Sequence, residues 1–194
     1  EIQNKGVEAM NFDIFDKSEI EKYEAEVRER WGNTKAYQEY GQKDVARKDS
    51  SFGKSANELM AMFSALGELK HLPPDADEVQ KKISALQKFI SDHYYACTDE
   101  ILSGLGEMYV CDERFKNNID KAGGEGTADF ARQAIAVYCA KAAAKQQEGL
   151  KKGISGTVET LREFGHGDLE IKKAIMQRYE LTAEEAEKYL CEEI

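Results

Sequence analysis

Proline, tryptophan and histidine are all scarce in this chain. Its 194 residues include two prolines, one tryptophan and three histidines. Because proline ends helices, a chain with so little of it can form long helical segments. The three histidines (His71, His93 and His166) are far apart and fit none of the spacings typical of a metal site. We therefore expect no metal ion and no other cofactor.

Motifs of reactive cysteines and of phosphate-binding loops are also absent. The four cysteines (Cys97, Cys111, Cys139 and Cys191) have no CxxC spacing, which argues against a zinc site and a redox motif. Widely separated thiols in a helical chain are typical of a reduced, cytoplasmic protein. The glycine-rich segment 123–126 lacks the Lys-Ser/Thr pair of a P-loop. With no nucleophile–base pair either, the sequence predicts a protein that is not an enzyme.

Basic side chains are too few for a surface that binds polyanions. There are 27 Lys and Arg against 37 Asp and Glu, which gives a net charge of −10. Nucleic acid phosphates and anionic lipid headgroups both favour a basic surface, so we expect this chain to bind neither directly. No apolar run approaches the length of about 18 residues that a membrane span needs. DNA binding, and any dimer, would then depend on a region upstream of Glu1.

Hydrophobic residues recur at helical spacing along most of the chain, and no segment alternates as a strand does. The pattern predicts a helix over 17–31, a second helix after Ser55, and a long helix over 79–105 with one continuous apolar face. The Pro73-Pro74 pair separates the second helix from the long one. The fold class expected is therefore all-α.

The composition changes near residue 145. Residues 140–147 contain few core-forming side chains and are expected to form a helical or frayed connector, followed by three short helices. Thr182 and Glu185 have the spacing of a capping box for the last of them. We therefore expect an N-terminal leader over 1–16, a main helical domain over 17–145 and a three-helix appendage over 146–194.

Large aromatic side chains fall outside strict core spacing. Tyr94 and Tyr95 are neighbours, so they cannot both point to the same side of a helix, and Gly104 and Gly106 loosen the predicted helix end. Aromatic groups around such an end can line a cleft for flat, heterocyclic or apolar ligands, although an aromatic core would have the same composition. Cys97 has two interpretations: a small buried hydrophobe, or a reactive thiol whose pKa His93 lowers.

Two separated motifs resemble a known family. Residues 23–37 (YEAEVRERWGNTKAY) and 105–115 (LGEMYVCDERF), together with Asn118-Ile119-Asp120, resemble the TipAS antibiotic-recognition domain. Phe12-Asp13-Ile14-Phe15 is similar to the short segment before the first motif. The resemblance covers about residues 11–142.

The resemblance implies an all-helical, globin-like domain that binds thiopeptide or other peptide-derived antibiotics. Such a domain is the effector-binding part of MerR-type transcription regulators, or a separate protein that sequesters the drug. Motif position and aromatic character together predict ten ligand-binding residues. They are Trp31, Asn33, Tyr37, Tyr94, Cys97, Met108, Tyr109, Asp112, Phe115 and Asn118.

One position departs from the family pattern. The resemblance implies two cysteines, two turns apart, of which the second captures the dehydroalanine tail of the ligand covalently. Counted back from the Gly106-Glu107-Met108-Tyr109 motif, Cys97 matches the first cysteine and Gly104 occupies the position of the second. We therefore predict reversible binding.

The predicted mechanism is closure of a cleft as N-terminal helices become ordered, with the mobility in residues 35–54. The alternative function is a protein–protein adaptor that uses an aromatic groove together with the C-terminal three-helix module. A sensor would bind small drugs without that module, whereas an adaptor would lose its partner.

Overall fold

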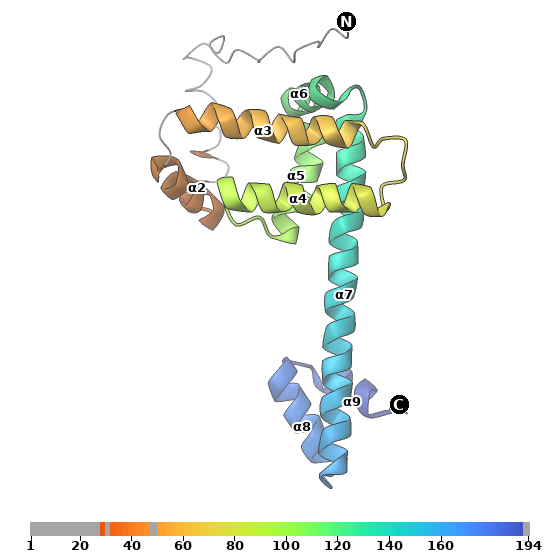
Figure 1. Ribbon diagram of the computed structural model, residues 1–194. Coiled ribbons are helices and arrows are strands. Elements are labelled where there is room, and N and C mark those ends of the chain that lie inside the picture. The colour runs from red at the N-terminus through yellow and green to blue at the C-terminus, as the bar shows by residue number, and fades with distance from the viewer. Residues whose placement is uncertain (1–27, 30–31, 47–49, 192–194) are drawn as a thin grey trace, which may run out of the picture. The chain divides into compact units, whose positions relative to one another are not determined.

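The structure is a computed structural model that describes residues 28–29, 32–46 and 50–191, with only the backbone for 42–46 and 50–54. The predicted leader over 1–16, most of the predicted helix over 17–31 and Trp31 lie outside these residues. Every regular element that the structure describes is a helix (Figure 1), which confirms the all-α fold class. The chain divides into two compact units, Glu1–Cys139 (unit 1) and Ala140–Ile194 (unit 2).

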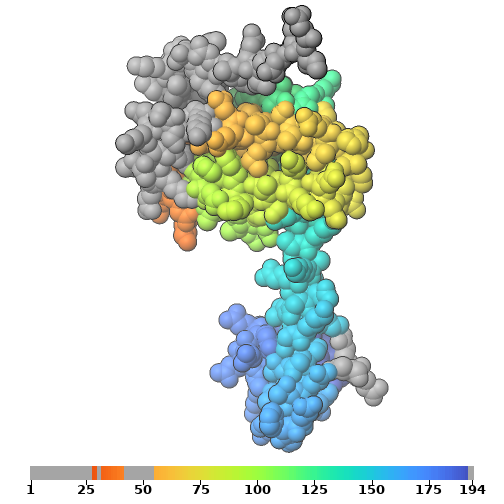
Figure 2. Space-filling model, in the orientation of Figure 1, coloured from red at the N-terminus to blue at the C-terminus, as the bar shows by residue number. Residues whose placement is uncertain are grey.

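From Lys35 onward, the described part of unit 1 consists of α2 to α6 and the beginning of α7. In chain order these are α2 (Lys35–Ala46), α3 (Ser50–Gly67), α4 (Asp77–His93), α5 (Asp99–Cys111), α6 (Glu113–Gly123) and the first part of α7 (Thr127–Glu163). The helices α3 and α4 run antiparallel beside each other, joined through Pro73 and Pro74 (Figure 1). They also lie together at the surface of unit 1 in Figure 2. The helix predicted after Ser55 begins earlier, at Ser50.

The predicted single helix over 79–105 is wrong, because the chain breaks at residues 94–98. The α4 helix ends at His93, and Thr98 starts α5 by accepting a hydrogen bond from the Ile101 amide through Oγ1 at 3.4 Å. Ser91 Oγ accepts a second bond, at 3.1 Å, from the Cys97 amide. These side chains satisfy amide groups that a continuous helix would satisfy internally. The apolar spacing keeps its phase across the break, so periodicity alone does not reveal it.

The longest helix is instead α7, with 37 residues from Thr127 to Glu163. It contains residues 140–147, which are helical, and it also contains most of the first short helix expected after them. The units divide after Cys139, six residues before the predicted boundary at 145. Unit 2 consists of the rest of α7 with α8 (Asp168–Tyr179) and α9 (Ala183–Cys191).

Each unit has a hydrophobic core of its own. In unit 1 the Phe63 and Tyr109 rings meet edge to face at 5.2 Å between centroids. The core of unit 2 is smaller and consists of Ile154, Val158, Ile171, Ile175 and Ala186. The predicted capping box of α9 is confirmed, since the Thr182 amide donates to Glu185 Oε2 at 2.8 Å and the Glu185 amide to Thr182 Oγ1 at 3.3 Å. Across the part of the chain that the structure describes, no helix has both the length and the apolar character needed to cross a bilayer.

Candidate functional site

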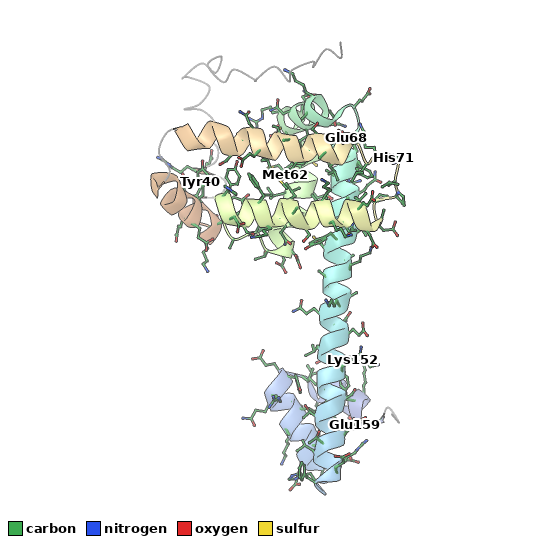
Figure 3. All side chains as sticks on the ribbon, viewed as in Figure 1. Tyr40, Met62, Glu68, His71, Lys152 and Glu159 are labelled. Atoms are coloured by element: carbon green, nitrogen blue, oxygen red, sulfur yellow. The ribbon has the colours of Figure 1, made fainter. Side chains whose placement is uncertain are left out.

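The break between α4 and α5 brings together aromatic side chains that are distant in sequence. Tyr40 of α2 stacks on Tyr94 with 6.5 Å between ring centroids and 9° between planes. Phe89 of α4 meets Tyr94 edge to face at 6.3 Å and stacks on His93 at 4.2 Å. Figure 3 shows Tyr40 beside the C-terminal end of α4. The break therefore has an aromatic wall that is built from α2 and α4.

A hydrogen bond also joins α2 to the break. The Ala96 amide donates to Glu39 Oε2 at 2.9 Å, and Lys35 lies 3.7 Å from the same carboxylate. Ala96 belongs to no helix, so its amide would otherwise depend on solvent. One carboxylate of α2 thus satisfies a backbone donor that the break leaves open.

The groups beneath the aromatic wall are weak acids that stay protonated. Burial raises the pKa of Tyr95 to about 12 and that of Cys97 to about 11, and nearby acidic groups add to both effects. Burial also raises the pKa of Tyr109. At neutral pH the site therefore offers neutral hydroxyl and thiol groups rather than an anionic nucleophile.

Cys97 is a buried side chain, with 6% of its surface exposed. The interpretation in which His93 lowers the pKa of this thiol is wrong, because burial raises that pKa. The His93 Nδ1 atom lies 3.0 Å from the Phe89 carbonyl oxygen and so is engaged within its own helix. Cys97 thus fits the alternative of a small hydrophobe.

The predicted residues fall at two ends of α5. Tyr94, Cys97 and Tyr109 lie near one another, since Tyr94 and Cys97 both contribute to the raised pKa of Tyr109. Tyr37 is half-buried in α2, Asn33 is exposed just before it, and Met108 is half-buried against the core.

The other three predicted residues, Asp112, Phe115 and Asn118, lie beyond the opposite end of α5. Asp112 caps α6 by accepting a hydrogen bond from the Arg114 amide at 3.0 Å. Phe115 and Asn118 are exposed on α6. Tyr109 itself lies in the last turn of α5, three residues before Asp112, so the two groups adjoin each other along the chain at that end of the helix. The ligand-binding role of all ten residues stays a prediction.

Sequence reasoning missed an apolar pocket of about 250 Å³ between α3 and α4. Ala61 and Ala65 of α3 and Ala85 of α4 contribute to its lining with small side chains, and Met62 lies between the two helices (Figure 3). Lys82 is its one charged lining residue. None of the ten predicted residues lines this pocket. No signal in the sequence marks this pocket, since alanine is also a good helix former.

Metal ligands do not gather anywhere in the described part of the chain, where no group of three or more His, Cys, Asp or Glu side chains could hold an ion.

Comparison with known proteins places unit 1 in a family. A model of the TipAS antibiotic-recognition domain matches residues 23–138. The HTH-type transcriptional activator TipA of Streptomyces coelicolor is 37% identical over 127 residues, which cover 64% of this chain and 49% of TipA. The HTH-type transcriptional activator Mta of Bacillus subtilis is 42% identical over 86 residues, covering 42% of this chain and 33% of Mta.

A solved structure of TipAS from Streptomyces lividans in complex with nosiheptide has the same fold. Its TM-score is 0.55 at 36% identity, and the match covers 67% of this chain and 90% of that one. The fold thus defines an all-helical, globin-like domain. The chain belongs to the TipAS antibiotic-recognition domain family. It spans about half the length of TipA, and unit 2 lies outside the matched residues.

Proposed function

We propose that unit 1 binds thiopeptide or other peptide-derived antibiotics reversibly at the break between α4 and α5. The observation that carries the proposal is the family match over residues 23–138, together with a relative of the same fold that is solved with nosiheptide. The aromatic wall of Tyr40, Phe89 and Tyr94 supports the position of the site, because such rings stack on flat heterocycles.

Movement of α2 would admit the ligand. The Tyr40–Tyr94 stack and the Glu39–Ala96 hydrogen bond join this helix to the break, and ligand entry would replace them with contacts to the antibiotic. Without ligand, we expect amide hydrogens in residues 35–46 to exchange faster than those in α4. With ligand bound, exchange in residues 35–46 should become slower. Equal protection of both helices in the free protein would contradict this mechanism.

Within a longer protein, such binding would control transcription. TipA and Mta are HTH-type transcriptional activators, and this chain matches only part of each. The domain then acts either as the effector-binding part of a MerR-type regulator, with DNA bound by another region, or as a separate protein that sequesters the drug.

A second candidate function, a protein–protein adaptor, has one observation in its favour. Phe164 and Leu169 of unit 2 are 78% and 79% exposed on either side of the Gly165-His166-Gly167 turn. Exposed apolar groups of this size are typical of interaction surfaces. An adaptor would lose its partner on the double substitution Phe164→Ser and Leu169→Ser, whereas an antibiotic-binding domain would keep its affinity for the drug.

The test is a titration of Trp31 fluorescence with nosiheptide, followed by intact-mass analysis of the same sample. Saturable quenching with unchanged protein mass is expected. An increase in mass by one ligand would overturn reversible binding and implicate Cys97. An absence of any response up to micromolar ligand would overturn the proposal for this drug class.

Gly104→Cys supplies the complementary experiment. Gly104 is exposed in α5, and no neighbouring atom lies within 4 Å of a Cβ placed there. A thiol at this position has room to add across the double bond of a dehydroalanine, a step that has no leaving group. The variant should therefore gain the mass of one nosiheptide, and Ser103→Cys on the adjacent exposed position serves as the control.

A further inference from the structure

The side chain of Gln87 in α4 forms hydrogen bonds with three other segments of unit 1. Its Nε2 atom donates to the Cys97 carbonyl at 3.1 Å and to Asp99 Oδ1 of α5 at 2.7 Å. Its Oε1 atom accepts from the Tyr138 hydroxyl of α7 at 3.1 Å. The amide of one side chain thus connects the break, the first turn of α5 and α7.

The backbone of Cys97 is consequently fixed by α4 on both sides. Its carbonyl accepts from Gln87, and its amide donates to Ser91 Oγ, which itself donates to the Gln87 carbonyl at 2.9 Å. With both backbone groups bound, the side chain stays in the core, where 6% of its surface is exposed. Neither Gln87 nor Ser91 is among the ten predicted ligand-binding residues.

We propose that Gln87 is the positioning residue of the break between α4 and α5, and that its hydrogen bonds hold the Cys97 thiol in a buried, unreactive position. The inference concerns the regulation of the proposed antibiotic site and in that respect rests on the proposed function. Without Gln87, the segment 94–98 opens more often and presents the thiol to electrophiles. The raised pKa of Cys97 agrees with this, because burial is its largest cause.

Gln80 is a matched control on the same helix. Its Nε2 atom donates to the Pro74 carbonyl at 2.7 Å and to the Ala134 carbonyl of α7 at 3.1 Å. Its bond to Ala134 therefore also joins α4 to α7, and its bond to Pro74 joins α4 to the turn before it, seven residues earlier than Gln87 and away from the break. Gln80→Leu should loosen the contact between α4 and α7 without releasing Cys97.

The first experiment measures the labelling rate of Cys97 with a dithiodipyridine. It uses the full chain with Cys111→Ser and Cys191→Ser, which remove the two exposed thiols, and peptide mapping separates Cys97 from Cys139. Gln87→Leu should accelerate labelling of Cys97 about tenfold, as expected for local opening after the loss of a hydrogen bond to a charged group. Gln80→Leu should stay within about twofold of the parent, because it leaves the bonds at the break intact. Equal acceleration in both variants, or none in Gln87→Leu, would overturn the proposal.

A second variant tests whether the bond to Asp99 carries the effect. Gln87→Glu places a carboxyl group against Asp99 Oδ1, so the two repel when both are ionised and share a hydrogen bond when one is protonated. The measured quantity is the ratio of the labelling rate in Gln87→Glu to that in the parent protein. This ratio should exceed one at pH 8 and approach one at pH 5. Cys97, Cys139 and Tyr138 face the same junction, so the parent is measured at each pH as the reference. A ratio that is the same at both pH values would contradict positioning through Asp99.

The affinity for nosiheptide separates this inference from the proposed function. Gln87→Leu should weaken binding several-fold relative to Gln80→Leu, since the break positions Tyr94. Equal affinities of the two variants would overturn the link to the site. If the parent protein does not bind nosiheptide, the proposed function fails. The difference in Cys97 labelling rate between Gln87→Leu and Gln80→Leu still tests the role of Gln87.

Discussion

Gly67 and Gly123 approach so closely that a methyl group on Gly67 would lie 2.1 Å from the Gly123 carbonyl oxygen. These glycines are the last residues of α3 and α6, which pack against each other. The nearest obstacle is backbone, which cannot rotate away as a side chain can. This contact therefore requires glycine for steric reasons.

Gly67→Ala should consequently lower the free energy of unfolding of unit 1 by about 1–3 kcal/mol, the usual range for overpacking. Gly104→Ala is the control, because that glycine is helical and has open space around its Cβ position. It should raise stability by about 0.5–1 kcal/mol through helix propensity. Urea denaturation of both variants measures the difference, and equal midpoints would contradict the close approach.

Tyr94→Ala should weaken the binding of nosiheptide about fivefold to tenfold, since it removes the ring that Tyr40 stacks on and Phe89 meets. Isothermal titration calorimetry gives the affinity directly. Tyr189→Ala in unit 2 is the control, being half-buried and outside the matched residues. Unchanged affinity in Tyr94→Ala would exclude the break as the binding site.

The stability of unit 1 should fall at alkaline pH because of Cys97. Burial raises the pKa of this thiol from 9.0 to about 11, so the folded state holds the proton more tightly than the unfolded state does. The resulting stabilisation is complete below pH 9 and is lost as the pH rises toward 11. Between pH 8 and pH 10 the loss should be about 1 kcal/mol.

Urea midpoints at the two pH values measure this effect. Cys97→Ala should reduce the decline between pH 8 and pH 10, whereas Cys111→Ala should retain it in full, because Cys111 is exposed. The same decline in both variants would assign the effect to the other groups whose pKa is raised by burial, which are Cys139, Tyr95 and Tyr109.

Because each unit has its own hydrophobic core, we expect a destabilising substitution in unit 2 to leave the stability of unit 1 unchanged. Ile175 is fully buried among residues of unit 2 alone, and Ile175→Ala should destabilise that unit by about 2–4 kcal/mol. Hydrogen exchange followed by mass spectrometry should show faster exchange in α8 and α9, with α3 and α4 unaffected. Ile83→Ala in unit 1 should give the reverse pattern. Faster exchange in both units after either substitution would contradict independent cores.

Much of the helical structure could be predicted from local patterns. The capping box of Thr182 and Glu185, which lie three residues apart, is observed at the start of α9. The turn at Pro73-Pro74 separates α3 from α4 as expected. These features depend on residues within about one helical turn, where propensity and capping act.

The site was less accessible to the same reasoning. The aromatic groups at 94 and 109 were identified, but the break that groups them was interpreted as the middle of a helix. Across this break, the side chains of Ser91 and Gln87 form hydrogen bonds with the backbone of Cys97. Such bonds leave no periodic signal. The pocket between α3 and α4 was missed because alanine is a good helix former and does not mark a cavity.

By itself, the sequence determined the helical class, the capping box of α9 and the family motifs, because each depends on residues close together in the chain. Only the tertiary structure decided where α4 ends, how deeply Cys97 is buried and which side chains meet at the break. The hydrogen bond between Gln87 and Tyr138 joins residues 51 positions apart, and the one between Glu39 and Ala96 joins residues 57 apart. Contacts over such separations arise from the packing of whole helices, which no local pattern of residues specifies.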